Sequence, residues 1–226
     1  MVSGFDVVRH PTARRTRLAM DPVTGRARLV VPRRASLKAA IAWAEGKADW
    51  IAAERARLPE ARPFIDGATI PVAGAVLRIV WNSESRARTP RRDGDCLILG
   101  GPAETVPARV EGWLRRTALD ILTEDTLAVA RSAGVDVTRV GIGDPRGRWG
   151  SCASGGAIRY SWRLILAPPF VRHATVAHEV AHRIHMNHGP AFHALAAELT
   201  GTDPGPARDW LRRHGTQLHW YGRSSG

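Results

Sequence analysis

One segment constrains this chain more than any other, because it places two histidines and a glutamate at helical spacing among small apolar residues. Residues 176–199 read VAHEVAHRIHMNHGPAFHALAAEL and hold five of the nine histidines. Within them, His178, Glu179 and His182 form an HExxH pattern. On an α-helix, residues four apart are separated by about 40° around the axis and about 6 Å along it. Both imidazoles can therefore reach one metal ion, while the carboxylate acts on water at the same face.

A pair of histidines hydrogen-bonded inside a packed interior is the alternative to a metal site. The residues around the pattern are small and apolar, which predicts a buried helix, and they are Val176, Ala177, Val180 and Ala181. Buried imidazoles and carboxylates need polar partners, and a divalent cation supplies one to all of them. We therefore favour a metal, with zinc as the expected ion.

A catalytic zinc needs a third protein ligand and an open fourth position. His185 would lie about 10 Å from the first histidine along a straight helix, which is too far to share one ion. Glu198 resembles the distant glutamate ligand of some metallopeptidases. His188 follows Asn187, which suits the end of a helix, and precedes Gly189–Pro190, which redirects the chain. We expect the turn to bring His188 back. The predicted ligands are His178, His182 and His188, and Glu179 is the predicted general base.

The rest of the chain alternates between strand and helix patterns, which predicts an α+β fold. Apolar residues alternate with arginines around a DPVTG turn at 21–25 and predict a β-hairpin. Helices are expected over residues 36–58, 106–134, 175–186, 190–199 and 209–220. Short strands are expected over 69–72, 75–81, 96–99 and 135–142, with an arginine-rich loop over 83–95. Strand patterns dominate before residue 106 and helix patterns after it. This suggests a β-rich N-terminal lobe with one helix over 1–105 and a catalytic domain over 106–226.

The net charge of +12 and a pI near 11.3 are compatible with binding to nucleic acid. The only lysines are Lys38 and Lys47, and the arginines are spread along the chain, so a compositional bias explains the charge equally well. The N-terminal hairpin also has no interleaved aromatics, which is typical of a scaffold and not of a base-stacking platform.

Two cysteines, Cys96 and Cys152, are too few for a disulfide framework. The N-terminus is charged before any apolar run and does not resemble a secretory signal. The longest apolar stretch, 164–171, contains Pro168 and Pro169 and is too short to cross a bilayer. We expect a cytoplasmic protein that does not enter a membrane.

Three further segments give the sequence a resemblance to a known family. The segments RWGSC (148–152), YSWRLILAPP (160–169) and VAHEVAHRIHMNHGPAF (176–192) together resemble the YgjP-like zinc metallopeptidases, a group related to the SprT-like proteases. The resemblance implies a zincin-like catalytic lobe with a β-rich N-terminal extension, and protein or peptide substrates. The histidine of its NHG-x-x-F element, taken as the third zinc ligand, corresponds to His188. His193 departs from the bulky aromatic usual after Phe192, which we expect to alter packing more than chemistry.

Competing interpretations remain at this point. A basic, DNA-associated protein with structural zinc would need four ligands, often cysteines, and no nearby cysteine pair exists. A further interpretation combines peptidase activity with DNA association: a zinc protease that is recruited to DNA, as some SprT-like relatives are. A metzincin would have glycine where this chain has His185. Arg148 suits an oxyanion contact and a structural role equally, whereas Trp149 suits packing and Cys152 suits a small buried thiol.

Overall fold

The chain folds into two compact units, Met1–Glu60 and Ala61–Gly226, in a computed structural model that describes residues 4–85, 87 and 89–224. Both units combine helices with strands, so the α+β class is confirmed. The division falls at residue 60 and not at residue 105 as expected. The reason is that the strands between these two positions share a hydrophobic core with the helices that follow them.

The first unit is a three-stranded sheet with two helices. Its elements are β1 (Phe5–His10), β2 (Arg17–Asp21), β3 (Arg26–Pro32), α1 (Leu37–Glu45) and α2 (Ala48–Ala56). The expected hairpin is confirmed as the antiparallel pair β2–β3, and β1 adds a parallel strand to the other side of β3. Ser36 begins α1 by accepting a hydrogen bond from the Ala39 backbone N–H at 3.3 Å. The single helix expected over 36–58 is interrupted at Gly46, where α1 ends.

Burial alternates along β3 and gives its sheet one apolar and one basic face. Ala27, Leu29 and Val31 are buried, and the last two pack against α1. Arg26 and Arg28 point to the opposite face and are exposed. The apolar face therefore supplies a small core of its own, separate from that of the second unit.

The second unit contains two sheets and the longest helix. The four-stranded sheet has the order β4-β5-β7-β6 and the three-stranded sheet the order β8-β10-β9. Its strands are β4 (Thr69–Val72), β5 (Ala75–Asn82), β6 (Arg91–Asp93), β7 (Cys96–Gly100), β8 (Arg139–Gly143), β9 (Gly150–Cys152) and β10 (Ala157–Ser161). Its helices are α3 (Val106–Ala133), α4 (Pro169–Ala181), α5 (Pro190–Thr200) and α6 (Gly205–Leu218), with 3-10 turns at Ala103–Thr105 and Trp162–Leu166.

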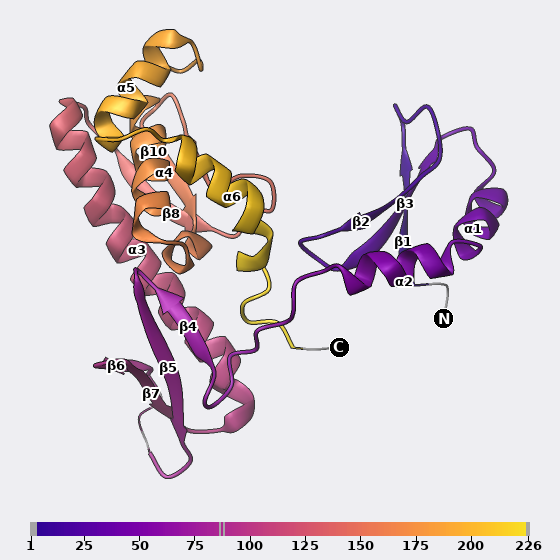
Figure 1. Ribbon diagram of the computed structural model, residues 1–226, viewed down its shortest axis with the longest axis horizontal. Helices are drawn as coiled ribbons and strands as arrows, with labels where there is room; N and C mark the ends of the chain where they lie inside the picture. Colours follow the sequence, from indigo (N-terminus) through magenta and orange to yellow (C-terminus); the bar gives the residue numbers. More distant parts are fainter. Residues whose placement is uncertain (1–3, 86, 88, 225–226) are drawn as a thin grey trace. The chain divides into compact units, whose positions relative to one another are not determined.

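Helix α3 joins the two sheets through one continuous core, as Figure 1 shows by its course along both. Val110, Leu114 and Leu122 are fully buried on its inner stripe. The helix ends where expected, at Gly134, whose φ of 65° lies in the left-handed region that glycine tolerates best. This core fixes the sheets and α4 relative to one another, and so positions the site described below.

Several other expectations in this unit differ from the structure. Helix α6 begins at Gly205 and not at 209, because Pro204 and Pro206 favour the first turn of a helix. Strand β6 forms within the arginine-rich segment 83–95, of which residues 86 and 88 lie outside the described part. Strand β8 begins at Arg139 and not at 135. No helix of the described residues combines the length and the apolarity that crossing a bilayer requires.

Candidate metal centre

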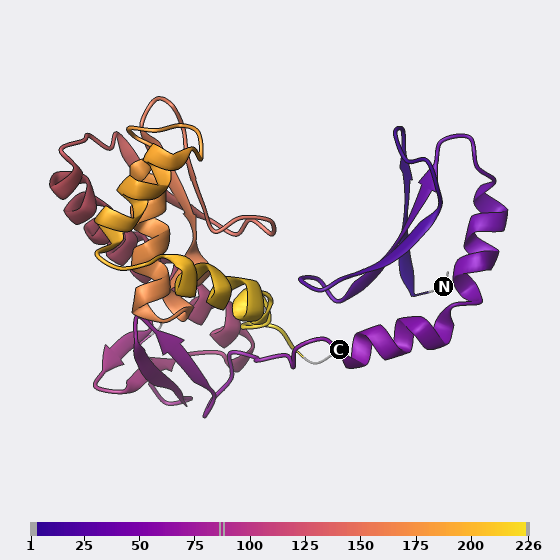
Figure 2. The ribbon, with the colours of Figure 1, turned by 45° about the horizontal axis from the view of Figure 1, so that its top comes forward.

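Helix α4 carries the first half of the HExxH pattern into the core of the second unit. It begins at Pro169 and not at the expected residue 175, because proline needs no hydrogen-bond acceptor in the first turn. It contacts α3, α5, α6 and β9, and Figures 1 and 2 show it among the three helices. Its buried residues include Val171, Val176 and Val180. His178 and Glu179 lie in its last turn and are therefore held by a packed helix.

The helix ends one turn earlier than its sequence predicts. It stops at Ala181 with His182 as its C-cap, and residues 183–189 form turns before α5 begins at Pro190. Asn187 has no left-handed backbone conformation, contrary to the expectation. Because α4 ends early, the segment before α5 can reverse direction and bring His188 back beside the end of α4.

The three predicted ligands converge. One ring nitrogen from each of His178, His182 and His188 lies within 4.8 Å of the other two. The Nε2 atoms of His178 and His188 are 3.3 Å apart. Two nitrogens bound to a tetrahedral zinc at about 2.0–2.1 Å lie about 3.3 Å from each other. The rings of His178 and His182 are nearly perpendicular, as are those of His182 and His188. The donor set and its spacing therefore fit a divalent metal ion.

The protonation states of His178 and His182 also suit metal binding. The Nδ1 atom of His182 lies 3.0 Å from the carbonyl oxygen of His185, which can only accept a hydrogen bond. Nδ1 therefore carries the proton, and Nε2 is free as a ligand. Burial, together with the neighbouring histidines, lowers the pKa of His178 to about 4. Its imidazole is thus neutral at physiological pH, as metal ligation requires.

Phe192 forms the apolar wall behind the three imidazoles. It is 1% exposed, and its ring centroid lies 4.9 Å from that of His178, 4.5 Å from His182 and 4.7 Å from His188. It packs with Ala181 and Ala196 in a small separate cluster. Phe192 was not among the predicted site residues, although the sequence shows its spacing from His188 in NHGPAF.

The side chain of Glu179, which projects from α4, packs against Gly150 of β9. It is 6% exposed, and burial raises the pKa of its carboxyl to about 7, while the charge of Arg148 opposes that rise. A Cβ at Gly150 would lie 2.3 Å from Oε1 of Glu179, so no other residue fits there without displacement. The carboxyl is thereby held beside the histidines, with a pKa suited to accepting and returning a proton near neutrality.

Strand β9 presents unpaired backbone groups at this site. It is the edge strand of its sheet. The Ser161 N–H donates to the Trp149 carbonyl at 2.8 Å, and the Ala153 N–H donates to the Ala157 carbonyl at 2.9 Å. In an antiparallel ladder the paired residues alternate, so residues 149, 151 and 153 face β10. The N–H and C=O groups of Gly150 and Cys152 consequently point to the free edge.

Two cavities adjoin the histidines, one toward each end of β9. A cavity of about 270 Å³ lies beside Trp149 and Gly150 and is lined mainly by apolar side chains of α4, α5 and α6. A second, of about 300 Å³, lies beside Ser151 and Cys152 and includes all three imidazoles. Arg148 is exposed and lines both.

The loop that leads into the RWGSC segment is held by a partly buried ion pair that the sequence did not predict. Arg163 is 8% exposed and donates from Nε and Nη2 to Asp144 at 2.7 and 3.0 Å. Its Nη1 donates to the carbonyls of Leu218 and Tyr221. These bonds tie the loop before β9 to the end of α6, where Trp149 packs on His219. No local motif marks this pair, because its members are distant in sequence.

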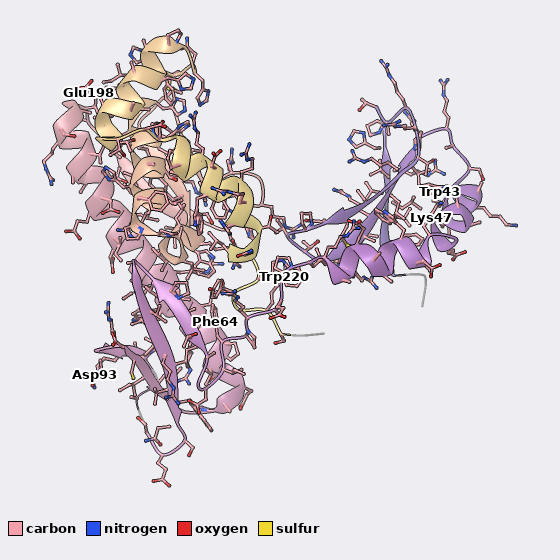
Figure 3. All side chains as sticks on the ribbon, viewed as in Figure 1. Trp43, Lys47, Phe64, Asp93, Glu198 and Trp220 are labelled. Atoms are coloured by element: carbon pink, nitrogen blue, oxygen red, sulfur yellow. The ribbon has the colours of Figure 1, made fainter. Side chains whose placement is uncertain are left out.

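The remaining candidates lie outside the metal cluster. Glu198 is exposed on α5 (labelled in Figure 3) and is absent from the group of ligand atoms found among the described residues. His185 contributes its backbone carbonyl and not its ring to the His182 contact. Burial raises the pKa of the Cys152 thiol, which keeps it protonated near neutral pH. Trp149 is half-buried in packing contacts, as expected.

A family model described as YgjP-like, metallopeptidase domain, matches residues 14–214. The chain belongs to the YgjP-like family. The expected family is thereby confirmed, and with it a metallopeptidase domain that spans most of this YgjP-like chain. A comparison with curated proteins finds no match. Among solved structures, the crystal structure of Wss1 from Saccharomyces cerevisiae is distantly similar, with a TM-score of 0.36 and 16% identity over 70% of this chain and 99% of that one.

Proposed function

We propose that this YgjP-like protein is a zinc-dependent peptidase in which His178, His182 and His188 hold the metal. The observation that carries the proposal is the 3.3 Å separation of the His178 and His188 Nε2 atoms beside a buried carboxyl. Three imidazoles leave a fourth position for solvent, as catalytic zinc sites do. A zinc ion bound there would lower the pKa of water and polarise the carbonyl of a peptide bond.

Glu179 is the general base in this proposal. It accepts a proton from the attacking water on a carboxylate oxygen and later returns that proton to the leaving amine. Its confinement by Gly150 keeps the accepting oxygen in one place. The raised pKa supports both steps, because a carboxyl with a pKa of about 7 gives up and takes a proton near neutral pH with little cost.

The edge of β9 is the binding element for the substrate backbone. An extended peptide laid along β9 can exchange hydrogen bonds with the outward N–H and C=O groups of Gly150 and Cys152. Such bonds do not depend on the side chains of the substrate. They would place a peptide bond next to Glu179, because Gly150 contacts that carboxylate. Arg148 lines the same cleft and is available to stabilise negative charge on the carbonyl oxygen.

The test is metal analysis of the purified protein together with hydrolysis of a fluorogenic peptide mixture. We expect about one zinc per chain, loss of hydrolysis after chelation, and recovery when zinc is restored. A protein that binds no divalent metal, or that hydrolyses peptides equally well after chelation, contradicts the proposal. A cytoplasmic location remains a prediction from the sequence and is checked by cell fractionation.

A second candidate function, association with nucleic acid, is favoured by the charge of the first unit. Residues 1–60 hold 12 of the 33 basic and 6 of the 21 acidic residues, and so half of the net charge. Arg17 pairs with Val30 in the sheet register, which places it on the same exposed face as Arg28. Asp6 on that face is already paired with Arg26. This face supports contacts with phosphates and offers no aromatic platform for bases.

The salt dependence of duplex DNA binding tests this second candidate. Replacing Arg17, Arg26 and Arg28 with glutamine should weaken binding and reduce the slope of log K against log salt by about 3. The same change at Lys38, Lys47 and Arg57 removes equal charge from the helices, where Lys47 lies at the junction of α1 and α2 (Figure 3), and serves as the control. Equal losses in both triple variants, or no binding even at low salt, would reject a specific surface.

A further inference from the structure

The cavity at the Trp149 end of β9 is apolar and is walled by three helices. Its volume is about 270 Å³, and it shares His178 and Glu179 with the metal centre. Pockets for drug-sized ligands measure about 300–1,000 Å³, so this one suits a single side chain. Because it is continuous with the catalytic groups, its occupant belongs to the molecule that reacts there.

Alanines keep this cavity open. Ala174 on α4, Ala196 on α5 and Ala207 on α6 all line it, and each is less than 10% exposed. Phe192 and Leu211 complete the apolar wall. A larger side chain at any of the three alanines would occupy the space. An apolar occupant would leave water and gain contacts with this wall, which favours leucine, methionine or phenylalanine side chains over polar ones.

The rim of the cavity is polar and basic. Arg148, Arg208 and His193 lie at its edge, and all three are exposed. A buried aspartate or glutamate would have no partner among the apolar residues deeper in the cavity, whereas the main chain of a substrate at the rim meets these polar groups. The interior of the cavity therefore favours an apolar side chain. Its polar rim still accepts the main chain of the substrate, including a charged terminus.

The direction of β9 decides which substrate residue reaches the cavity. The cavity lies at the Trp149–Gly150 end of the strand, and the second cavity lies at the Ser151–Cys152 end. A peptide that pairs antiparallel to β9 runs from the second end to the first. Antiparallel pairing is the more stable arrangement per residue. The residue on the amine side of the cleaved bond is then the one that faces the apolar cavity.

We propose that this cavity, called here the apolar pocket, binds the side chain that follows the cleaved bond, so that the protein cleaves on the N-terminal side of large apolar residues. The proposal rests on the proposed function, because it needs the metal centre beside the pocket to act on peptides. Ala174, Ala196, Ala207 and Leu211 set the size of the side chain accepted.

The test compares cleavage and binding with peptides that differ only in the residue after the target bond. The zinc-loaded protein should cleave peptides with leucine, methionine or phenylalanine at that position at least about tenfold more efficiently, in kcat/KM, than those with glycine or aspartate. The inactive Glu179→Gln variant should bind the same peptides with the same order of affinity. Equal kcat/KM for all residues, or selection on the acyl side of the bond, overturns the proposal.

Two variants locate the preference. Ala196→Leu should narrow the pocket and shift the preference toward alanine and glycine, whereas Leu211→Ala should widen it and favour phenylalanine. Ala194→Leu makes the same change at an exposed position of α5 and should leave the preference unchanged. Thermal unfolding identifies a variant that fails to fold, and the other variant then decides. If both variants fold and neither changes the preference, the selectivity arises elsewhere in the protein and the pocket proposal is rejected.

The binding measurement separates the two proposals. If Glu179→Gln binds apolar peptides preferentially while the zinc-loaded wild type cleaves none, the peptidase reaction and the proposed cleavage site fail, and only the preference of the pocket for apolar side chains stands. If the wild type cleaves peptides while Glu179→Gln binds them without preference, the pocket fails and the peptidase reaction stands.

Discussion

Gly150 and Glu179 approach each other so closely that position 150 of β9 has no room for a side chain. The position of a Cβ on Gly150 would be 2.3 Å from Oε1 of Glu179 and 2.6 Å from its Cγ. Gly150 does not have a positive φ, so its backbone conformation does not require glycine. The requirement comes from the carboxylate itself. The RWGSC and HExxH segments thus meet through one contact, and each restrains the other.

Gly150→Ala should displace the Glu179 carboxyl and lower peptidase activity by about 10²-fold, the effect expected from a shift of about 1 Å in a catalytic group. The histidines are untouched, so metal content should remain. Gly147→Ala is the control, because a Cβ at Gly147 meets nothing within 4 Å. Peptide hydrolysis and metal content of both variants provide the measurement. Full activity in Gly150→Ala would contradict the role given to this contact.

Glu179→Gln should leave the metal bound and lower kcat by about 10²–10⁴-fold, because an amide keeps the shape of the carboxyl and cannot accept the proton. Metal analysis and single-turnover hydrolysis measure the two effects separately. Glu198→Gln makes the same change at an exposed site on α5 and should retain activity. Loss of metal in Glu179→Gln would instead indicate that the carboxylate is a ligand.

His188→Ala should lower zinc affinity by more than the roughly 10–100-fold that loss of an outer-shell partner costs, since it removes one of the three proposed ligands. The affinity is measured by competition with a chelator of known strength. His185→Ala should have a small effect, because that residue contributes its backbone carbonyl to His182. If Glu198→Ala releases the metal and His188→Ala does not, the ligand assignment is wrong.

Phe192→Ala should loosen the three imidazoles and weaken zinc binding about 10–100-fold, in addition to a loss of stability of about 3–5 kcal/mol from the cavity created. Phe192→Leu retains most of the volume and should recover much of both losses. Chelator competition and chemical unfolding give the two quantities. Unchanged zinc affinity in a folded Phe192→Ala protein would show that the ring does not position the ligands.

Asp144→Asn should destabilise the protein by about 1–3 kcal/mol near neutral pH, because the nearly buried Arg163 would lose its charged partner, whose own side chain is 30% exposed. Burial alone would raise the pKa of Asp144, but hydrogen bonds and charge from Arg163, with His219, outweigh burial and lower it. The stabilisation is therefore present above the pKa of the unfolded chain, about 3.9, and is lost as the pH falls through the lower folded value.

Urea unfolding of the wild type and Asp144→Asn from pH 7 to pH 3 measures this linkage. The difference in free energy should be constant above about pH 5 and should shrink below about pH 4. Asp93→Asn removes an exposed pair with Arg91 (Asp93 is labelled in Figure 3) and should have little effect. A difference that grows as the pH falls would contradict the assigned direction.

The sequence predicted which histidines converge better than it predicted the elements around them. Helical spacing identified His178 and His182, and the turn residues after them identified His188, which the structure brings within reach. These are local properties of one segment. The expected end of the helix near 186 was wrong, because nothing local shows that the helix stops at Ala181.

What the sequence determined by itself is the set of donors, most of the helices and several of the strands, and many of the points where glycine and proline interrupt them. Only the tertiary structure decided that Gly150 closes on Glu179, that Phe192 lies behind three imidazoles, and that alanines from three helices enclose one cavity. Spacing along the chain specifies which residues share a helix face. Contacts between distant segments depend on how the core packs, and no local pattern records that.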